Sequence, residues 1–406
     1  MGSSRVFVIM ATVFVISMAT AVGTRGGKDL KVGLFGVEQT LQKRSPYDNP
    51  TDPKRPLFRY APGFAILQRP FLLKARMVAP FEFEDITPSV FAWYAAGILS
   101  LALSMLILLR LIPAASAAGA LRNLRLSLLM AMPLIGYELA NGQNKLMALF
   151  FMLLAIFLFE KKRMFLAALS FNLALTIYIP LFTFILYFIL RGRGRFIVSF
   201  IAGAAIIFFI LPSLVFGPGF NAFLLKDWLL RCLKPFFSAT TYTTYIDLRT
   251  SSQSLPSAIG RVFTIGHTHR FQYFISPLIV HGIIRVCSTL IVLLSCLAVW
   301  KRDREVSRGL GYALFLILAL ILPSYCIYYT WAWLFVIYFA VLNYMSFEGT
   351  PARDKKVFKY LIIILFISSW LISVHLFNHL SLLFWATLLM WVGLFSVLKR
   401  APVPKA

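Results

Sequence analysis

Acidic residues are scarce in this sequence. Its 406 residues include 15 Asp and Glu against 40 Lys and Arg, which gives a formal net charge of +25. None of the acidic residues lies in the middle of a long apolar run. Ion- and proton-coupled transporters usually carry ionisable groups at membrane depth, so this absence argues against that class. We ascribe the positive charge to basic loops on anionic leaflets and to a phosphate-bearing ligand, and we expect no nucleic acid partner.

Cysteine and the usual phosphate-binding motifs are scarce as well. Four cysteines are scattered without paired spacing: Cys232, Cys287, Cys296 and Cys326. This pattern favours packed thiols over disulfides or metal ligands. The chain also has no Gly-rich phosphate loop and no Asp-x-Asp motif of the kind that holds a metal for a nucleotide sugar. We therefore expect no cofactor and no metal site.

Apolar residues are abundant. The chain is 60% hydrophobic and 16% aromatic, with a mean hydropathy of +0.80, which indicates a polytopic membrane protein. We predict one all-α transmembrane domain over 1–406 with about 12 spans and both termini cytoplasmic, because every short basic loop then lies on one side. The predicted spans are 5–22, 89–110, 126–139, 145–159, two half-spans of 164–190 that divide at Pro180, 196–216, 277–299, 310–325, 327–346, 359–377 and 380–398. Residues 5–22 have the alternative of a cleaved signal peptide, since Ala19-Thr20-Ala21 resembles a cleavage site.

Two long loops, 24–88 and 217–275, fall together on the non-cytoplasmic side of this topology. In the first, Leu30, Leu34, Val37 and Leu41 share one helical face, which predicts an amphipathic helix in the lipid interface. Asp29 lies in its first turn, where the helix dipole stabilises a carboxylate. In the second loop, 221–234 predicts another amphipathic helix, whose polar stripe is Lys226, Asp227, Arg231 and Lys234.

Four short stretches occur in a telling order along the first two thirds of the chain. They are Asp29 followed by Pro46-Tyr47-Asp48, then Arg59-Tyr60-Ala61-Pro62, then Gly142-Gln143-Asn144, and last Gln253-Ser254-Leu255 with Arg261 close behind. Together they resemble the GT-C membrane glycosyltransferases, and most closely glycosyltransferase family 87, the polyprenol-phosphate-mannose-dependent mannosyltransferases.

The chain also departs from that family. The family often has a Lys two residues before the Pro of the short hairpin, where this chain has Tyr178 before Pro180. It often has a Trp and paired His after a Pro, where Pro323 here is followed by Cys326, Tyr328 and Tyr329, and Ser252 replaces the usual Asn before Gln-Ser-Leu. These changes leave the sugar and the acceptor open.

The resemblance implies a multi-pass protein of a bacterial inner or plasma membrane, with its site on the extracytoplasmic side. Its reaction would move a hexose, with mannose as first candidate, from a polyprenyl-phosphate donor to a hydroxyl of a lipid or glycan acceptor, with inversion. Asp29 matches the family's general base, while an external Asp is otherwise a helix cap or a solvated side chain. Asp48 is the runner-up base, and its alternative is an Asx turn in Asp-Asn-Pro.

Candidate substrate contacts surround these motifs. Arg59 and Arg261 are candidates for the leaving phosphate, because guanidinium groups bind phosphate through two parallel donors; their alternative is a solvated or headgroup-binding side chain. Gln143 and Asn144 are candidates for sugar hydroxyls, with capping of a tight turn as the alternative, and Gln253 of the Gln-Ser-Leu motif is a further candidate for substrate binding. Tyr60 would stack on a sugar or anchor at the interface, and His267 would assist at a phosphate or hydroxyl.

Two further functions remain open from the sequence. A lipid flippase or transporter without transferase activity would have the same composition, although such proteins usually contain internal repeats and polar groups at membrane depth. A GT-C relative that modifies protein or lipid A is the other possibility. The concentration of polar residues in two external loops favours an enzyme that acts at the membrane surface.

Overall fold

We describe a computed structural model of the chain. The structure describes residues 28–47, 58–79, 82–192, 194–233, 248, 251–265, 272–300, 305–323, 326–371, 377–378 and 380–400. The first predicted span, 5–22, lies outside these residues. The described part is mostly helical, and its strands form two short antiparallel hairpins, β1 (Arg76–Ala79) with β2 (Glu82–Glu84) and β3 (Thr264–Ile265) with β4 (Gln272–Tyr273).

The helices follow the predicted apolar runs closely in several places. In chain order the longer ones are α2 (Lys28–Leu41), α4 (Thr87–Leu111), α5 (Ala117–Ala140), α6 (Lys145–Glu160), α7 (Met164–Ile177), α9 (Arg195–Ala204), α11 (Pro218–Trp228), α15 (Pro277–Val299), α16 (Glu305–Ile321), α17 (Leu334–Ser346), α18 (Ala352–Trp370) and α20 (Leu382–Arg400). Shorter elements include α3 (Pro62–Gln68), α8 (Phe184–Gly192), α10 (Leu211–Phe216) and α14 (Leu255–Val262).

Fewer helices are long enough to cross a membrane than the sequence predicts. By length and composition, the described residues contain four such helices, which are α4, Arg195–Phe216, α15 and α20. The pair α5 and α6 adds a fifth if it counts as one span, although it bends by 119°. Several other apolar helices have 10–17 residues, and crossing a 30 Å hydrocarbon layer takes about 20 residues. The prediction of about 12 spans is therefore not confirmed.

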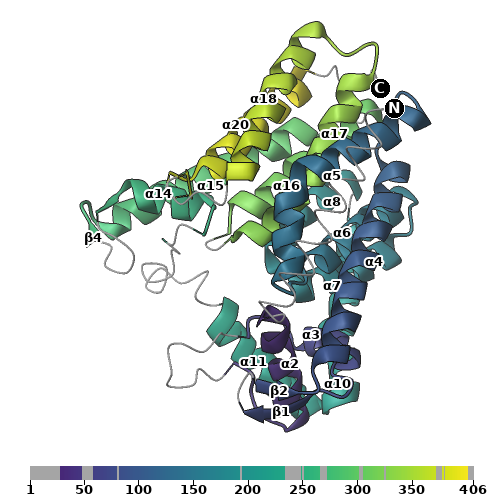
Figure 1. Cartoon of the computed structure of the whole chain (residues 1–406), viewed down its shortest axis with the longest axis vertical. Helices are drawn as coiled ribbons and strands as arrows, with labels where there is room; N and C mark the ends of the chain where they lie inside the picture. Colours follow the sequence, from purple (N-terminus) through teal and green to yellow (C-terminus); the bar gives the residue numbers. More distant parts are fainter. Residues whose placement is uncertain are drawn as a thin grey trace.

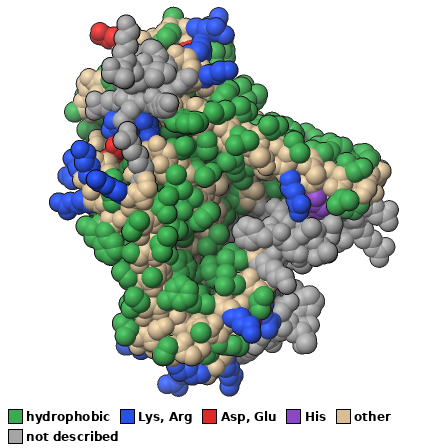
Figure 2. Space-filling view, turned by 180° about the vertical axis from the view of Figure 1, so that it is seen from behind, with side chains coloured by type: hydrophobic (Ala, Val, Ile, Leu, Met, Phe, Trp, Pro, Cys, Tyr) green, Lys and Arg blue, Asp and Glu red, His purple; other side chains and the backbone are tan. Residues whose placement is uncertain are grey.

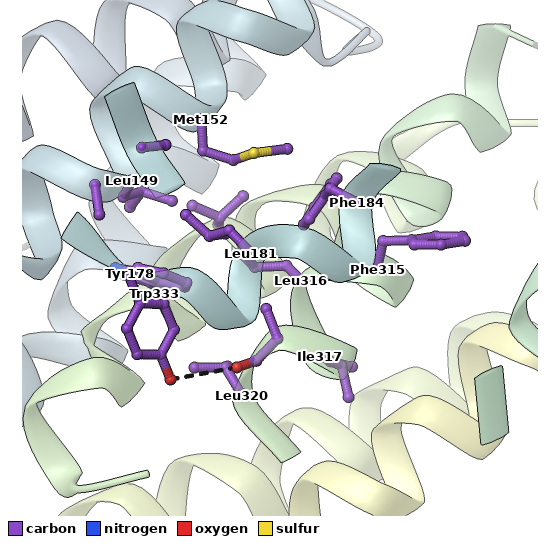
Figure 3. Packing of buried hydrophobic residues seen from close by; sticks show 14 of the residues in the cluster. Leu149, Met152, Tyr178, Leu181, Phe184, Phe315, Leu316, Ile317, Leu320 and Trp333 are labelled. Atoms are coloured by element: carbon purple, nitrogen blue, oxygen red, sulfur yellow. Dashed lines mark hydrogen bonds between the residues drawn. The ribbon is translucent and has the colours of Figure 1, made fainter. Parts of the chain in front are cut away.

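The break predicted at Pro180 is present. Helix α7 ends at Ile177, Tyr178 is extended (φ −146°, ψ 92°), and a 3₁₀ helix, η2 (Ile179–Thr183), leads into α8. Proline lacks a backbone N–H and restricts its predecessor, so the α7 helix does not continue through this point. We call α7, η2 and α8 together the helical hairpin. Figure 3 shows part of this hairpin, with Leu181 and Phe184, between α6 and α16.

The centre of the molecule is made by α16 and α17. Every residue of 310–321 and of 334–341 is buried, and a helix that is apolar all round belongs inside a protein. Leu149 and Met152 of α6 and Phe315 of α16 pack around the hairpin (Figure 3). Tyr178 donates a hydrogen bond of 3.4 Å to the Ala319 carbonyl. The helical hairpin is thus packed between α6 and α16.

The elements of the first long loop gather at one end of the molecule. There α2 packs on α3, and α10 and α11 also contact α3 (Figure 1). The prediction that the apolar face of α2 lies in lipid is wrong for Leu30, Leu34 and Val37, which are buried within the protein, whereas Leu41 at the end of the helix is 40% exposed. A helical stripe shows that a face is apolar, but it does not show whether lipid or protein covers it.

Helix α11 and the π-helical turn after it, η4 (Leu229–Leu233), match the second predicted amphipathic helix. The predicted polar stripe is wrong for Asp227, however, which is buried. Its carboxylate accepts hydrogen bonds from the Ser45 hydroxyl and, at 2.5 Å, from Arg231 Nε. Because burying a carboxylate requires such donors, Asp227 ties α11 to the chain beyond α2.

Gly36 allows the close approach of α2 to the segment before α3. A Cβ at this position would overlap the ring of Phe58, which is itself 1% exposed. We expect Gly36→Val to destabilise the protein by about 1–3 kcal/mol, because overpacking forces the backbone to move. Thermal unfolding in detergent would show this as a lower midpoint. Gly282→Val in α15 is the matched control, since nothing lies within 4 Å of a Cβ there; equal midpoints for both variants would contradict the expectation.

The surface separates apolar from basic residues. Figure 2 shows hydrophobic side chains over the middle of one face, and Lys and Arg mainly toward its two ends. The exposed apolar side chains include Val198, Leu214, Leu278 and Val286, which are at least 60% exposed. Soluble proteins rarely expose such large apolar areas. This surface fits a protein whose middle part is surrounded by lipid.

Candidate active site

Asp29 contacts the turn between α5 and α6. Its carboxylate accepts a hydrogen bond from Gln143 Nε2, and its backbone N–H donates to the Asn141 carbonyl at 3.2 Å. Asp29 lies in the first turn of α2, where the helix dipole favours negative charge. The structure thus brings together two motifs that are more than 100 residues apart in the sequence, and it holds Asp29 at both its backbone and its carboxylate.

The turn over residues 141–144 has a defined shape. Gly142 has φ +64°, a left-handed conformation that glycine adopts without strain. Its carbonyl accepts a hydrogen bond of 2.8 Å from Trp93 Nε1 of α4. From the preceding helix, Glu138 Oε1 accepts a bond of 3.1 Å from the Leu146 N–H and so caps the start of α6. Gln143 and Asn144 are both buried as a result, at 7% and 2% exposed.

Lys145 is the first residue of α6 and is also buried, at 7% exposed. Its ammonium donates a hydrogen bond of 3.1 Å to Asn144 Oδ1. The same Nζ lies 5.3 Å from the ring centre of Tyr60 and 4.9 Å from that of Tyr178, within the range of cation–π attraction. At position 178 the resembled family often has Lys, whereas this chain has an aromatic ring. The cation next to that ring is Lys145 of α6.

The Arg59-Tyr60-Ala61-Pro62 stretch lies against α7. The Ala61 N–H donates to the Thr176 carbonyl at 3.3 Å, and the Tyr47 hydroxyl donates to the Tyr60 carbonyl at 2.8 Å. Burial raises the pKa of Tyr47 well above its usual value, so this phenol remains a neutral donor. Arg59 is exposed, and its carbonyl accepts a bond of 3.3 Å from Trp228 Nε1.

The Gln-Ser-Leu motif reaches the same region through Cys326. The Gln253 N–H donates to the Cys326 carbonyl at 2.9 Å, and the Cys326 N–H donates to the Ser252 hydroxyl at 3.2 Å. The Tyr178 hydroxyl lies 3.8 Å from the Cys326 sulfur. Gln253 is fully buried, and its Nε2 donates to the Asn378 carbonyl at 3.0 Å. Gln253 therefore joins the segment before α14 to two later parts of the chain.

Arg261 lies on α14, close to the same segment. Its Nη2 donates to the Ser252 carbonyl at 2.8 Å, and its Nε donates to the Ser381 hydroxyl at 3.1 Å. The guanidinium is therefore engaged by groups of the protein on two of its nitrogens. These bonds hold α14 against the start of α20.

A large apolar cavity of about 1060 Å³ begins beside this site. Ile179 and Pro180, which directly follow Tyr178, form part of its wall, and so does Trp228, which bonds to Arg59. Side chains of the hairpin, α9, η3 (Ala205–Ile210), α11 and η4 form most of the rest. Lys226 also lines the cavity. Its size and lining suit a long hydrocarbon chain.

Some predicted residues cannot be placed. Asp48 and His267 lie outside the described residues. Conversely, Glu138 and Lys145, which lie on either side of Gly-Gln-Asn, were not among the predicted site residues. Two opposite charges next to a polar turn were the available signal, but nothing in the sequence indicates that both are buried.

The cysteines are free thiols. Burial raises the pKa of the Cys232 thiol to about 12, which makes it an unreactive packed group. Within the described ranges, no three His, Cys, Asp or Glu side chains cluster in a way that would hold a metal ion.

Comparison with known proteins identifies the family. Searches of the curated proteins and of the solved structures found no match. The model of glycosyltransferase family 87 matches residues 58–320, more than half of the chain. This range includes the Tyr60, Gly-Gln-Asn and Gln-Ser-Leu motifs, whereas Asp29 precedes it. The chain belongs to glycosyltransferase family 87 and is a membrane glycosyltransferase.

Proposed function

We propose that this enzyme transfers a hexose, with mannose as the first candidate, from a polyprenyl-phosphate donor to a hydroxyl of a lipid or glycan acceptor. The transfer takes place on the extracytoplasmic side and inverts the anomeric configuration, with Asp29 as general base. One observation carries the proposal: the Asp29 carboxylate is bonded to Gln143, next to a buried cation and near a large apolar cavity. A carboxylate, a cation and a hydrocarbon slot are what a lipid-phosphate sugar requires.

The reaction needs a single displacement at the anomeric carbon of the sugar. The acceptor oxygen forms a bond to this carbon while the bond to the donor phosphate oxygen breaks. The proton of the acceptor hydroxyl moves to the Asp29 carboxylate, and the bonding electron pair leaves with the phosphate. Attack from the face opposite the phosphate inverts the configuration. Hydrogen bonds to Gln143 and Asn141 keep Asp29 in position for this transfer.

The cavity supports a lipid-linked donor. Its wall consists mainly of apolar side chains of the hairpin, η3, α11 and η4. A prenyl tail gains little energy by moving from lipid into an equally apolar groove. The groove instead fixes the depth and direction of the tail, and hence the place of the phosphate and sugar.

Other candidate contacts are assigned by position. Gln143 and Asn144 offer amides to sugar hydroxyls next to Asp29, and the Tyr60 ring offers a stacking surface beside Lys145. Arg59 is exposed near the cavity wall, where it can meet a phosphate from the solvent side. Gln253 and Arg261 hold the surrounding segments together through the bonds described above.

A transfer assay tests the proposal directly. Purified enzyme in nanodiscs is given radiolabelled mannosyl-phosphoryl-polyprenol together with candidate lipid and glycan acceptors. We expect label to move to an acceptor and unlabelled polyprenyl phosphate to be released. If no lipid-phosphate sugar supports transfer while the enzyme scrambles lipids between leaflets, the protein is a flippase and the proposal is wrong.

A further inference from the structure

Glu138 and Lys145 flank the turn that contacts Asp29, and both are buried charged residues. Glu138 is 0% exposed and Lys145 is 7% exposed. Glu138 Oε1 accepts from the Leu146 N–H, whereas Oε2 has no hydrogen-bond partner among the described residues. Burying an ionised group costs several kcal/mol, and the attraction of its partners often restores no more than that cost. A buried pair of this kind is weak evidence for stability and calls for another explanation.

The Lys145 ammonium has donor capacity to spare. It carries three N–H donors, and within the described part of the chain one of them bonds to Asn144 Oδ1. The Tyr60 and Tyr178 rings attract the charge but accept no strong hydrogen bond. An anion with several acceptor oxygens would use the remaining donors.

The position of Lys145 matches one part of a lipid-phosphate donor. On one side, Gln143 and Asn144 connect it to the Asp29 carboxylate, where the sugar reacts. On the other side, Tyr178 under its Nζ is followed by Ile179 and Pro180 of the cavity wall. In such a donor the phosphate lies between the sugar and the tail. A sugar at Asp29 and a tail in the cavity therefore place the phosphate near Lys145.

We propose that Lys145 binds the phosphate of the donor and stabilises it as it leaves, and that Glu138 is a positioning residue for Lys145. This inference rests on the proposed function, since it assumes a lipid-phosphate donor. Of the arginines suggested by the sequence, Arg261 already donates to Ser252 and Ser381, and Arg59 is exposed. Lys145, by contrast, is a desolvated cation that bonds to Asn144, next to the Gln143 that holds the base, and contacts Tyr178, the residue before the cavity wall. In such a dry site an ion pair with phosphate is far stronger than in water.

Glu138 positions Lys145 and does not bind the phosphate itself. A lone ammonium buried against aromatic rings would be costly, and the nearby carboxylate offsets that cost before the donor arrives. Glu138 also caps α6 through the Leu146 N–H, so it fixes the helix from which Lys145 extends. Its effect on the reaction therefore acts through Lys145.

Inhibition by lipids that lack the sugar tests the proposal. Polyprenyl phosphate, the leaving group itself, and uncharged polyprenol of the same length are compared as inhibitors of transfer and as ligands of the purified enzyme. We expect Lys145→Gln to weaken binding of polyprenyl phosphate at least tenfold, which is about 1.4 kcal/mol, and to leave binding of polyprenol unchanged. Lys161→Gln, just beyond the other end of α6 and exposed, is the matched control and should bind both lipids as the wild type does.

A double variant separates phosphate binding from a purely structural role. Glu138→Gln with Lys145→Gln removes both charges, so no uncompensated charge remains buried. If the pair only stabilises the fold, this variant should bind polyprenyl phosphate normally, and the proposal is wrong. If Lys145 binds phosphate, the double variant should bind it as weakly as the single one does while its thermal midpoint recovers.

The failure of this inference differs from that of the proposed function. If wild-type enzyme shows no preference for polyprenyl phosphate over polyprenol and transfers no lipid-linked sugar, the proposed function itself fails. If the wild type prefers polyprenyl phosphate and Lys145→Gln keeps that preference, the enzyme uses another cation and only the role of Lys145 is refuted.

Discussion

Replacing Asp29 by Asn should lower the turnover number by about 10²–10⁴-fold, which is the contribution of a positioned general base. The amide has nearly the same shape as the carboxylate, and its oxygen can still accept the hydrogen bond from Gln143 Nε2. The backbone bond from residue 29 to the Asn141 carbonyl is unaffected. The amide, however, cannot take the proton of the acceptor hydroxyl. The loss should therefore appear in kcat, at an unchanged affinity for polyprenyl phosphate.

Initial rates at saturating donor, together with thermal unfolding in detergent, would measure this effect. Glu38→Gln is the matched control, because Glu38 lies on the same helix and bonds to Gln42 at 2.9 Å on its exposed side. This control should retain wild-type turnover. Wild-type rates in the Asp29→Asn enzyme would rule out Asp29 as the base and would turn attention to Asp48. A loss of rate together with a large drop in the unfolding midpoint would mean that Asp29 is structural.

The sequence predicted best where local chemistry decides the structure. The bounds of α4 and α15 were close to the predicted 89–110 and 277–299, since long apolar runs have few alternatives to a membrane helix. The break at Pro180 followed from the missing N–H of proline. The family was also predictable, because its motifs combine unusual residues in a fixed order.

The sequence predicted less well where the structure depends on which side chains are buried by distant parts of the chain. The apolar stripe of α2 was assigned to lipid, but Leu30 and Leu34 are covered by protein. The same limit explains Asp227, which a helical projection places among exposed charges, although it bonds to Ser45. Lys145 was the first residue of the predicted span 145–159, and its burial depends on Tyr60 and Tyr178, which are far from it in the sequence. Such contacts become visible only when the helices have been assembled.

Filling the apolar cavity should have the second large effect. Ala204 and Ala222 are the two alanines of its wall, and we expect Ala204→Trp and Ala222→Trp together to lower kcat/KM for a long-chain donor by about 100-fold. The tail would be displaced into the surrounding lipid at little cost in energy, but the phosphate and the sugar would move with it. A misplacement of about 1 Å at the reacting atoms is enough for a loss of this size.

Donor length distinguishes this explanation from general damage. A donor with a very short chain does not reach along the cavity, so the double Trp variant should use it nearly as well as the wild type does. Leu293→Trp on α15 is the matched control, because Leu293 is 53% exposed on the outer face and does not line the cavity. If the double Trp variant loses activity equally with short and long donors, the cavity is not the tail site. If it loses none, the tail stays in the bilayer during transfer, and the depth of the phosphate must be fixed by the groups around Lys145 and Asp29 alone.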